Sequence, residues 1–410
     1  MSGMNVPAGM LHPDDARGRV LQTVRPTGAE SVELALAPGR VVAEDIVARD
    51  DHPPFPAATM DGYAVVSHDG SPWREITGTQ PAGPIVPGLE VTEGYAVKIM
   101  TGAPLPPGAD AVIKIEDVEV SEDHIVLAEP TVPAGQYIRP VGSDLAEGAT
   151  VIRAGTRIGP VEVGLLATMG YPAVSVHQAP RVAVISTGDE LVDPGATLEP
   201  GTIRDSNRFA LVAALREAGA AVVHSSRVGD DIHELKALVQ RIRPEIDVLV
   251  TSGGVSVGDK DIVRMLLGET AEVHFQRVFM KPGKPLTFAT AGDLIIFGLP
   301  GNPVSSMVSL ELFVRPALLR MQGANDLLRP RVPVLLADPV QRSDRIEYQR
   351  AFLSVDSSGR LVASTTGNQI SSRLASMLGA NALLIVDPGD SEIPAGEMVE
   401  ALLIDVPRAG

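Results

Sequence analysis

The amino-acid sequence predicts a multidomain protein in which a central α/β domain is combined with β-rich domains. A chain of 410 residues is too long for one core, because single cores stop growing at about 250–300 residues. From Arg181 to about Pro316, short β-branched runs alternate with helical periodicity, a pattern that predicts βαβ units and a largely parallel sheet. The chain has 40 Gly and 34 Pro, and outside this region they separate short strand-like runs.

The N-terminal half predicts one discontinuous domain interrupted by a β-rich insertion. Residues 1–52 and 136–179 mix helical and strand patterns, and a helix is expected to open at Gly159-Pro160, because Pro suits the first helical turn. Residues 53–135 lack a strong helical period and predict a small inserted β domain. Its expected strands are Ala96–Met100, Ala111–Ile115 and Ile125–Ala128.

Residues 180–323 carry the βαβ pattern and are expected to form a separate domain. Asp231 followed by Glu234 predicts a helix start, and the helix continues with an apolar face before Pro244. Another helix is expected to end at Gly219. The expected strands are Val182–Ser186, Ala221–Ser225, Val248–Thr251 and Leu294–Phe297.

Residues 324–410 predict a second β domain, which we expect to be barrel-like. Turn residues again separate short strand patterns, and a short helical pattern surrounds Leu374–Leu378. The expected strands are Val332–Leu336, Gln349–Val355, Leu361–Ser364 and Ala382–Val386.

The composition excludes several classes of function. The chain has no Cys, so disulfides, thiolate nucleophiles and cysteine-ligated zinc are ruled out. A formal net charge of −17 argues against nucleic acid or an anionic membrane as partner, since both reward a basic surface. The N-terminal residues show no basic segment followed by an apolar run, so a cytoplasmic protein is expected.

A glycine-rich loop after an apolar strand is the first candidate binding site. The strand Val248–Thr251 runs into the loop, and a helix is expected to begin near Asp261. Glycines let backbone N–H groups approach a phosphate, and the N-terminus of the following helix adds positive partial charge. The alternative is a crossover turn that binds nothing, and neither a P-loop nor a dinucleotide fingerprint is present. The candidate residues are Thr251, Ser252, Gly253, Gly254, Val255, Ser256 and Gly258.

Two further loops of the same domain are candidates for anion binding. One joins a strand to a helix, with Asn302 as expected cap, Pro303 in the first turn and Ser305 beside free N–H donors. The other carries Lys281 and Lys284 on a proline-rich turn of an acidic protein. The alternatives are an ordinary helix start and ordinary solvated lysines.

Carboxylates follow three of the predicted strands. They are Asp189 and Glu190, Asp230 and Asp231, and Asp259 and Asp261. In an open α/β sheet such loops converge on one edge, and several carboxylates beside a phosphate suit Mg²⁺. Each Asp could instead cap a helix.

Taken together, the motifs resemble the molybdopterin molybdenumtransferase family, to which the gephyrin C-terminal domain and plant molybdenum-insertase domains are similar. The resemblance spans nearly the whole chain in order. It rests on Met60–Ala64, Thr101–Pro104, Ser186–Leu191, Thr251–Asp261, Lys281–Pro285 and Gly298–Ser305.

This resemblance implies four domains and an elongated homodimer. Residues 1–52 with 136–179 would then form an elongated dimerisation domain, and residues 180–323 a molybdopterin-binding domain. The implied reaction joins molybdate to adenylylated molybdopterin, with a divalent cation such as Mg²⁺, and releases molybdenum cofactor and AMP. A molybdopterin adenylyltransferase and molybdoenzyme maturation proteins are the implied partners. The alternative functions are molybdopterin adenylyltransferase itself or a gephyrin-like scaffold.

The resemblance also implies roles for individual residues. Acidic and hydroxyl groups of the catalytic cleft would be Asp61, Thr101, Asp144, Glu190, Asp230 and Asp261. Of these, Glu190, Asp230 and Asp261 would hold the metal. Oxyanion or molybdate handling would fall to Lys284, Ser305, Arg350 and Ser371. Lys281 and the loop residues Pro300, Gly301, Asn302 and Pro303 would line the same site.

Overall fold

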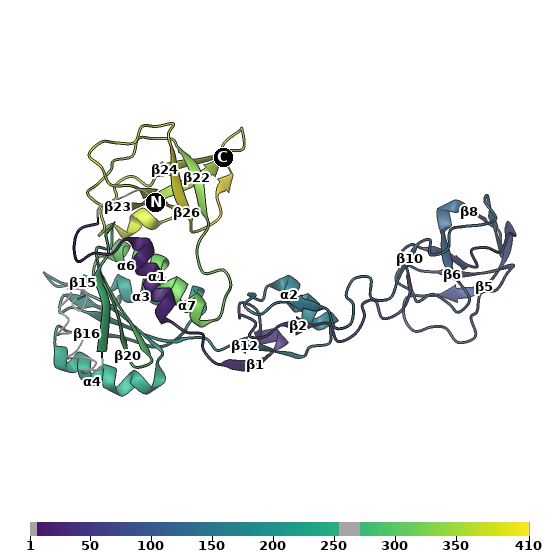
Figure 1. The fold of residues 1–410 in the computed structure, drawn as a ribbon, viewed down its shortest axis with the longest axis horizontal. Helices are drawn as coiled ribbons and strands as arrows, with labels where there is room; N and C mark the ends of the chain where they lie inside the picture. The colour runs from purple at the N-terminus through teal and green to yellow at the C-terminus, as the bar shows by residue number, and fades with distance from the viewer. Residues whose placement is uncertain (1–5, 254–270, 410) are drawn as a thin grey trace.

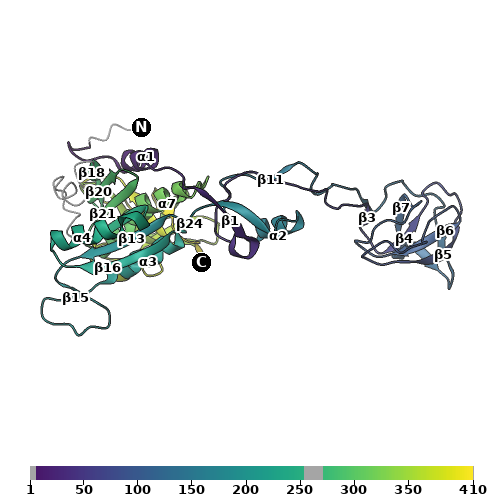
Figure 2. The same cartoon turned by 90° about the horizontal axis from the view of Figure 1, so that it is seen from below.

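The computed structural model describes residues 6–253 and 271–409 and has an L-shaped outline. One limb contains the central domain with the C-terminal barrel above it, and the other extends through the elongated domain to the inserted domain (Figure 1). Figure 2 shows the same separation from a perpendicular direction. The predicted combination of α/β and β domains is confirmed.

In the described residues, the central domain contains a six-stranded sheet with helices on both faces. The strand order is β16, β13, β17, β21, β20, β18, and the first four strands are parallel. Helices α3, α6 and α7 pack on one face and α4 on the other. The parallel strands are β13 (Arg181–Thr187), β16 (Ala221–Val228), β17 (Val248–Ser252) and β21 (Leu294–Leu299), and the helices are α3 (Ser206–Glu217), α4 (Ile232–Ile242), α6 (Pro303–Ser309) and α7 (Arg315–Met321).

Two antiparallel strands extend this sheet where the sequence pattern predicted no strand. β20 (Pro285–Ala291) pairs with β21, and β18 (Ala271–Arg277) pairs with β20. β20 and β21 are joined by Gly292 and Asp293, and Gly292 has a φ of +60°. A two-residue turn of this kind connects antiparallel neighbours, so the strand next to β21 cannot be a parallel crossover strand.

Short elements and a distorted helix complete the central domain. α6 and α7 are joined without a break by a π-helical segment, η5 (Leu310–Val314), just before Pro316. Pro316 lacks the N–H of a regular helical turn, and the helix continues beyond the point where the sequence pattern was expected to stop. The short elements are β14 (Leu191–Val192), β15 (Ile203–Arg204), η3 (Arg243–Glu245) and β19 (Met280–Lys281).

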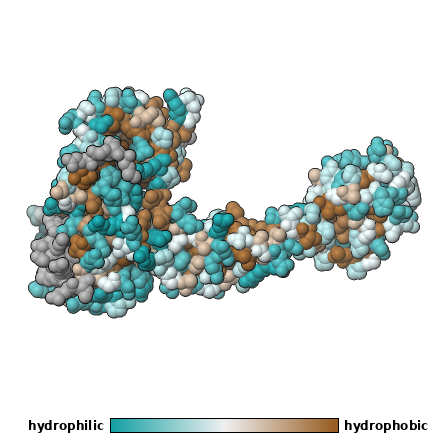
Figure 3. All heavy atoms as spheres, viewed as in Figure 1, coloured by the Kyte–Doolittle hydropathy of each residue, from teal (hydrophilic) through white to brown (hydrophobic). Residues whose placement is uncertain are grey.

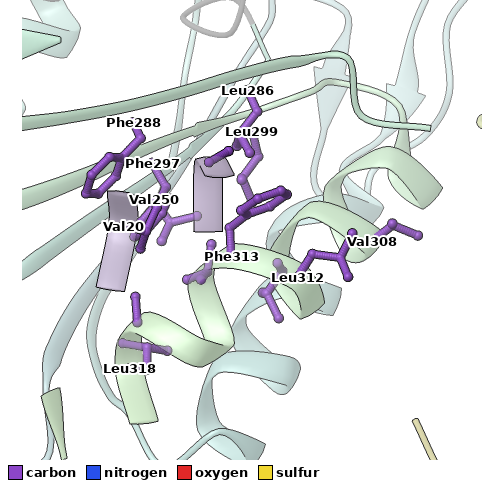
Figure 4. Packing of buried hydrophobic residues seen from close by; sticks show 14 of the residues in the cluster. Val20, Val250, Leu286, Phe288, Phe297, Leu299, Val308, Leu312, Phe313 and Leu318 are labelled. Atoms are coloured by element: carbon purple, nitrogen blue, oxygen red, sulfur yellow. The ribbon is translucent and has the colours of Figure 1, made fainter. Parts of the chain in front are cut away.

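The N-terminal helix α1 (Pro13–Thr23) packs on the central domain. Its buried residues Ala16 and Val20 lie in one core with Phe297 of β21 and Phe313 of η5. Figure 4 shows Val20 among these side chains, between the sheet and the helical segment. The predicted elongated domain includes residues 1–52 and therefore α1. In the structure the apolar face of α1 is buried in the central domain instead, and the chain reaches the elongated domain only after Val24.

The C-terminal domain is a closed barrel within residues 331–403. Strands β22, β24, β23, β25 and β26 pair in that order, and β26 returns to β22. Ile346, Tyr348 and Leu402 of the barrel lie in the core of the central domain, so the two domains share apolar packing. The elements are β22 (Arg331–Leu336), β23 (Ile346–Val355), β24 (Leu361–Thr365), η6 (Leu374–Met377), β25 (Ala382–Val386), β26 (Met398–Leu403) and β27 (Arg408–Ala409).

The elongated domain is built from segments on both sides of the insertion. β1 pairs with β12 and β2 with β11, and α2 covers them around a core that includes Ile152 and Leu166. The predicted helix start is confirmed, with Gly159 at the N-cap and Pro160 in the first turn. The elements are β1 (Ala29–Glu33), η1 (Leu34–Leu36), β2 (Ile46–Val47), β11 (Thr150–Ile152), α2 (Pro160–Thr168) and β12 (Ala173–His177).

The inserted domain is a six-stranded sheet within residues 62–127, with apolar residues buried on both faces. Along β4, Tyr63 and Val65 enter one core and Ala64 enters the other. A short pair of strands, β3 (Ala57–Ala58) and β10 (Ile138–Arg139), lies where the chain enters and leaves. The sheet order is β7 (Ala111–Lys114), β4 (Gly62–Val65), β6 (Tyr95–Ile99), β5 (Trp73–Gln80), β9 (His124–Leu127) and β8 (Val118–Val120), with η2 (Ile115–Asp117) between β7 and β8.

A buried ion pair should make the inserted domain sensitive to substitution of Arg74. Arg74 is fully buried, its Nε lies 3.4 Å from Asp69 Oδ2, and it donates to the carbonyls of Val66 and Pro130 at 3.0 and 2.9 Å. Arg74→Ala leaves Asp69 buried without its cation, so we expect a loss of about 3 kcal/mol in unfolding free energy. Urea denaturation followed by the fluorescence of Trp73 measures this. An unchanged midpoint of urea unfolding would contradict a stabilising role for the Arg74–Asp69 ion pair. Arg216→Ala, on the exposed side of α3, serves as the control.

Candidate functional site

The predicted glycine-rich loop begins at the edge of the central sheet where the parallel strands end. Thr251 and Ser252, the last residues of β17, are each 2% exposed. Gly253 follows with a φ of +113°, a conformation that favours glycine. The other predicted loop residues Gly254, Val255, Ser256 and Gly258, and with them Asp261 and the helix expected there, lie outside the described residues.

The backbone around Gly253 is closely packed. A Cβ atom at this position would lie 2.3 Å from the carbonyl oxygen of Thr187, at the end of β13. On the other side, a Cβ at Gly301 would lie 3.7 Å from the Cα of Gly253. The loops after β17 and β21 therefore meet at two glycines, where the backbone segments lie too close for a side chain at Gly253.

The loop between β21 and α6 is held from the barrel rather than by its own cap. Asn302 occupies the predicted N-cap position, but its side chain makes no capping hydrogen bond. Instead, Asn302 Nδ2 donates to Ser371 Oγ at 3.1 Å, and Val304 N donates to the Ser371 carbonyl at 3.0 Å. The predicted N-cap position of Asn302 is therefore confirmed, but a carbonyl of the barrel, and not the Asn302 side chain, satisfies a free N–H donor at the helix start.

Asn207 links the two glycine loops and was not predicted from the sequence. Its Nδ2 donates to Ser252 Oγ at 2.8 Å and to the Gly301 carbonyl at 2.7 Å. Asp205, the N-cap of α3, is buried and accepts from Ser186 Oγ at 2.5 Å. In the sequence, the run Asp205-Ser206-Asn207 indicates only a helix start. That Asn207 faces the site follows from the position of this helix after β15, which the sequence pattern does not give.

The predicted carboxylates of the loops after β13 and β16 lie at the same edge of the sheet, and Asp259 and Asp261 lie outside the described residues. Glu190 and Asp230 are exposed and follow β13 and β16, which are neighbouring parallel strands. Asp189 Oδ1 accepts the backbone N–H of Asp230 at 3.0 Å and so ties the two loops together. Within residues 6–253 and 271–409, no three Asp, Glu or His side chains are grouped closely enough to hold a metal ion.

A cavity of about 530 Å³ lies between the central domain and the barrel. Lys281 Nζ pairs with the buried Glu347 at 3.2 Å, whereas Lys284 has no ion-pair partner in the described part of the chain. Arg345, just before β23, also lines the cavity and was not predicted, because no motif surrounds it. The lining comprises Met280–Pro285, Asn302, Ser305, Arg345 and residues 368–371. A larger cavity of about 790 Å³, at the junction with the elongated domain, contains none of the predicted site residues.

The structure places the predicted residue Arg350 differently. Arg350 is fully buried on the face of β23 that carries Ile346 and Tyr348, outside the barrel core, and is absent from the lining of the cavity. Its guanidinium is hydrogen-bonded to Ser376 and to backbone carbonyls of residues 368–370. Ser371, by contrast, lies at the cavity and contacts α6.

Asp61 and Thr101 lie together in the inserted domain, at the far end of the molecule from the central sheet (Figures 1 and 2). Asp61 Oδ1 accepts the backbone N–H of Thr101 at 2.7 Å and its hydroxyl at 2.8 Å. These two bonds hold the pKa of Asp61 below its usual value. Asp144 is exposed beside His52, where the inserted and elongated domains join. Within one chain these residues do not meet Glu190 and Asp230.

Models of known families match three consecutive parts of the chain. Residues 11–170 match the MoeA N-terminal region (domain I and II). Residues 183–320 match the probable molybdopterin binding domain, and residues 334–404 match the MoeA C-terminal region (domain IV). The matches follow the chain order of the elongated and inserted domains, the central domain and the barrel.

Individual relatives give the same result. The molybdopterin molybdenumtransferase of Haemophilus influenzae is 32% identical over 95% of this chain and 98% of its own length. The gephyrin of Dictyostelium discoideum is 37% identical, and the chain spans 59% of it. The solved structure of a molybdopterin biosynthesis moeA protein from Pyrococcus horikoshii OT3 has a TM-score of 0.82 at 29% identity, covering 96% of this chain and 100% of that one. The chain belongs to the molybdopterin molybdenumtransferase (MoeA) family.

Proposed function

We propose that this enzyme of molybdenum cofactor biosynthesis inserts molybdate into adenylylated molybdopterin and releases molybdenum cofactor and AMP. The observation that carries the proposal is the cavity where the lysine loop, the start of α6 and the barrel loop of residues 368–371 meet. Lys284 supplies a cation, and Ser305 and Ser371 supply hydroxyl groups. Such a set of donors suits a tetrahedral dianion like molybdate.

The glycine loops supply the neighbouring part of the proposed site. Gly253 and Gly301 bring two backbone segments together, and Asn207 holds both through Ser252 and the Gly301 carbonyl. Backbone N–H groups at such a strand end suit the pyrophosphate of the substrate. Lys284 would hold the oxyanion while Thr251–Gly253 and the residues after them hold the phosphates.

We further propose Mg²⁺ as the divalent cation, with Glu190, Asp230 and Asp261 as its ligands. Glu190 and Asp230 are exposed carboxylates at the ends of adjacent strands, and carboxylate oxygens are the hard donors that Mg²⁺ prefers. Bound Mg²⁺ supplies charge neutralisation at the pyrophosphate. Asp189 keeps the two loops in place through its bond to Asp230.

We also propose that the protein works as a homodimer, in which the inserted domain of one protomer reaches the cleft of its partner. Asp61 directly precedes β4, and Glu190 follows β13. These two strands lie at opposite ends of the molecule (Figure 2). Brown areas follow the inner side of the L in Figure 3, over the barrel, the central domain and the elongated domain. Leu378 and Val406 are 83% and 77% exposed. Apolar areas on the inner side of the L are suited to contact with a second copy of the chain.

The alternative functions receive less support. A molybdopterin adenylyltransferase would need only the molybdopterin-binding region, whereas this chain also matches the family over residues 11–170 and 334–404. A gephyrin-like scaffold would not need the cationic cavity.

We propose a cytoplasmic location, with an adenylyltransferase upstream and molybdoenzyme maturation proteins downstream as partners. No helix in the described ranges is long and apolar enough to cross a membrane.

The direct test is molybdate-dependent release of AMP from adenylylated molybdopterin in the presence of Mg²⁺. Lys284→Ala removes the cation of the cavity that has no carboxylate partner in the described residues, so we expect the KM for molybdate to rise roughly tenfold, the effect of losing one charge-assisted contact. Lys236→Ala, on α4 across the sheet, should leave it unchanged. No molybdate-dependent AMP release by the unaltered protein would rule out the proposed reaction, and a normal KM for Lys284→Ala would remove this residue from the site.

A further inference from the structure

Arg350 is bonded to the loop that forms the barrel side of the cavity. Its Nε and Nη2 donate to Ser376 Oγ at 3.2 and 3.0 Å, and its Nη1 donates to the Gln369 carbonyl at 3.2 Å. Nη2 also approaches the carbonyls of Asn368 and Ile370, at 3.4 Å each. One planar guanidinium thus binds three consecutive carbonyls of the loop. Arg350 does so from the outer face of β23, because Tyr348 of the same face lies in the core of the central domain while Ala351 lies in the barrel core.

Gln369 completes the connection from the loop side. Its Oε1 accepts the backbone N–H of Arg350 at 2.9 Å, and its Nε2 donates to the Arg350 carbonyl at 3.2 Å and to the Gly367 carbonyl at 3.1 Å. The amide therefore pairs with the backbone of β23 as a neighbouring strand would. Because Arg350 is fully buried, the bonds from its guanidinium to Ser376 are shielded from competing water.

The same loop contacts the central domain at its other end. Ser371 accepts from Asn302 Nδ2 at 3.1 Å and, through its carbonyl, from Val304 N at 3.0 Å. A connected path thus runs from β23 through the loop to the first turn of α6, beside Ser305 and the cavity. Displacement of the loop would move Ser371 and the start of α6 together.

We propose that Arg350 and Gln369 are positioning residues that hold the loop 368–371 against α6 and thereby set the width of the oxyanion cavity. In this arrangement Arg350 does not touch the oxyanion, which differs from the role that the family resemblance implies for it. The inference rests on the proposed function only for its kinetic consequences, because the hydrogen bonds exist independently of turnover.

The test compares Arg350→Lys with Arg360→Lys, an exposed arginine of the same barrel. Lysine keeps the charge but cannot reach several carbonyls at once, so amide hydrogen exchange of residues 367–372 should increase in R350K. The KM for molybdate should rise roughly tenfold while kcat changes less than about threefold. R360K should leave exchange and KM unchanged.

Asn302→Ala, which breaks the contact at the other end of the path, supplies the discriminating measurement. If both residues act through the loop, the effects of R350K and N302A on KM should not add. Additive effects with unchanged exchange would mean that Arg350 binds the oxyanion directly, and would overturn the proposal.

Two further measurements keep the test independent of folding and of turnover. Ser376→Ala retains Arg350 but removes one of its acceptors, so amide exchange of the loop should increase as in R350K. This variant replaces R350K in the test if R350K does not fold. Should the unaltered protein release no AMP, hydrogen exchange and the binding of molybdate alone, measured by calorimetry, still decide between positioning and direct contact.

Discussion

Asp61→Ala should lower molybdate-dependent AMP release by roughly a hundredfold, the size of effect typical for loss of one preorganised polar group in a catalytic site. Asp61 is exposed and, among the described residues, its carboxylate is bonded to Thr101 alone, so the unfolding free energy should fall by no more than about 1 kcal/mol. AMP release and thermal unfolding measured side by side separate the two effects. Asp123→Ala, which removes an exposed carboxylate of the same domain, should leave AMP release within about twofold and thermal unfolding unchanged.

Mixing variants tests whether this carboxylate acts on the partner's cleft. A dimer of one Asp61→Ala chain and one Glu190→Ala chain would have one cleft lacking both groups and one cleft retaining both. We expect such a mixed dimer, isolated through two different tags, to regain roughly half of the unaltered activity. Each parent homodimer would remain impaired. A mixed dimer as inactive as its parents would show that the two groups do not complete one cleft across the dimer.

The fold could be predicted where local patterns decide it. α4 begins after Asp231 as expected, because the Asp231 side chain accepts the N–H of His233 at 2.8 Å, and its apolar face lies in one core. The four parallel strands were also predicted from short β-branched runs, and three of them, β13, β17 and β21, are buried on both faces, as is typical of such runs. β18 and β20 were not, because their pairing depends on the turn at Gly292 rather than on a difference in strand pattern.

The candidate site could be predicted only as far as motifs reach. The glycine loop, the lysine loop and the start of α6 stand out as motifs, and the structure brings their described residues together. The roles of Asn302 and Arg350 could not be predicted, because each depends on contacts with residues about 70 and 20 positions away in sequence, at Ser371 and at the loop 368–370. Asn207 and Arg345 carry no motif and became candidates only through their positions.

Gly253→Ala is expected to be the most damaging small substitution at the site. The added Cβ would lie 2.3 Å from the Thr187 carbonyl oxygen and 2.8 Å from Thr187 Oγ1, and alanine disfavours a φ of +113°. The backbone has little room to yield, because Ser252 is paired with Ser186 of β13 and Gly301 lies on the opposite side. Strain of this kind should cost about 4 kcal/mol in unfolding free energy and displace the phosphate loop, so AMP release should be lost.

Gly164→Ala provides the matched control, because a Cβ there meets nothing within 4 Å and the residue lies inside α2. Alanine favours the helix over glycine, so this variant should gain about 0.5–1 kcal/mol and keep full activity. Guanidinium unfolding and AMP release measured on both variants test the pair. If Gly253→Ala retained the stability and the AMP release of the unaltered protein, the close approach of β13, β17 and the β21–α6 loop would not constrain this position. If Gly253→Ala lost AMP release but kept its unfolding free energy, the added methyl group would not strain the folded protein. The loss would then come from a clash between this methyl group and the bound phosphate.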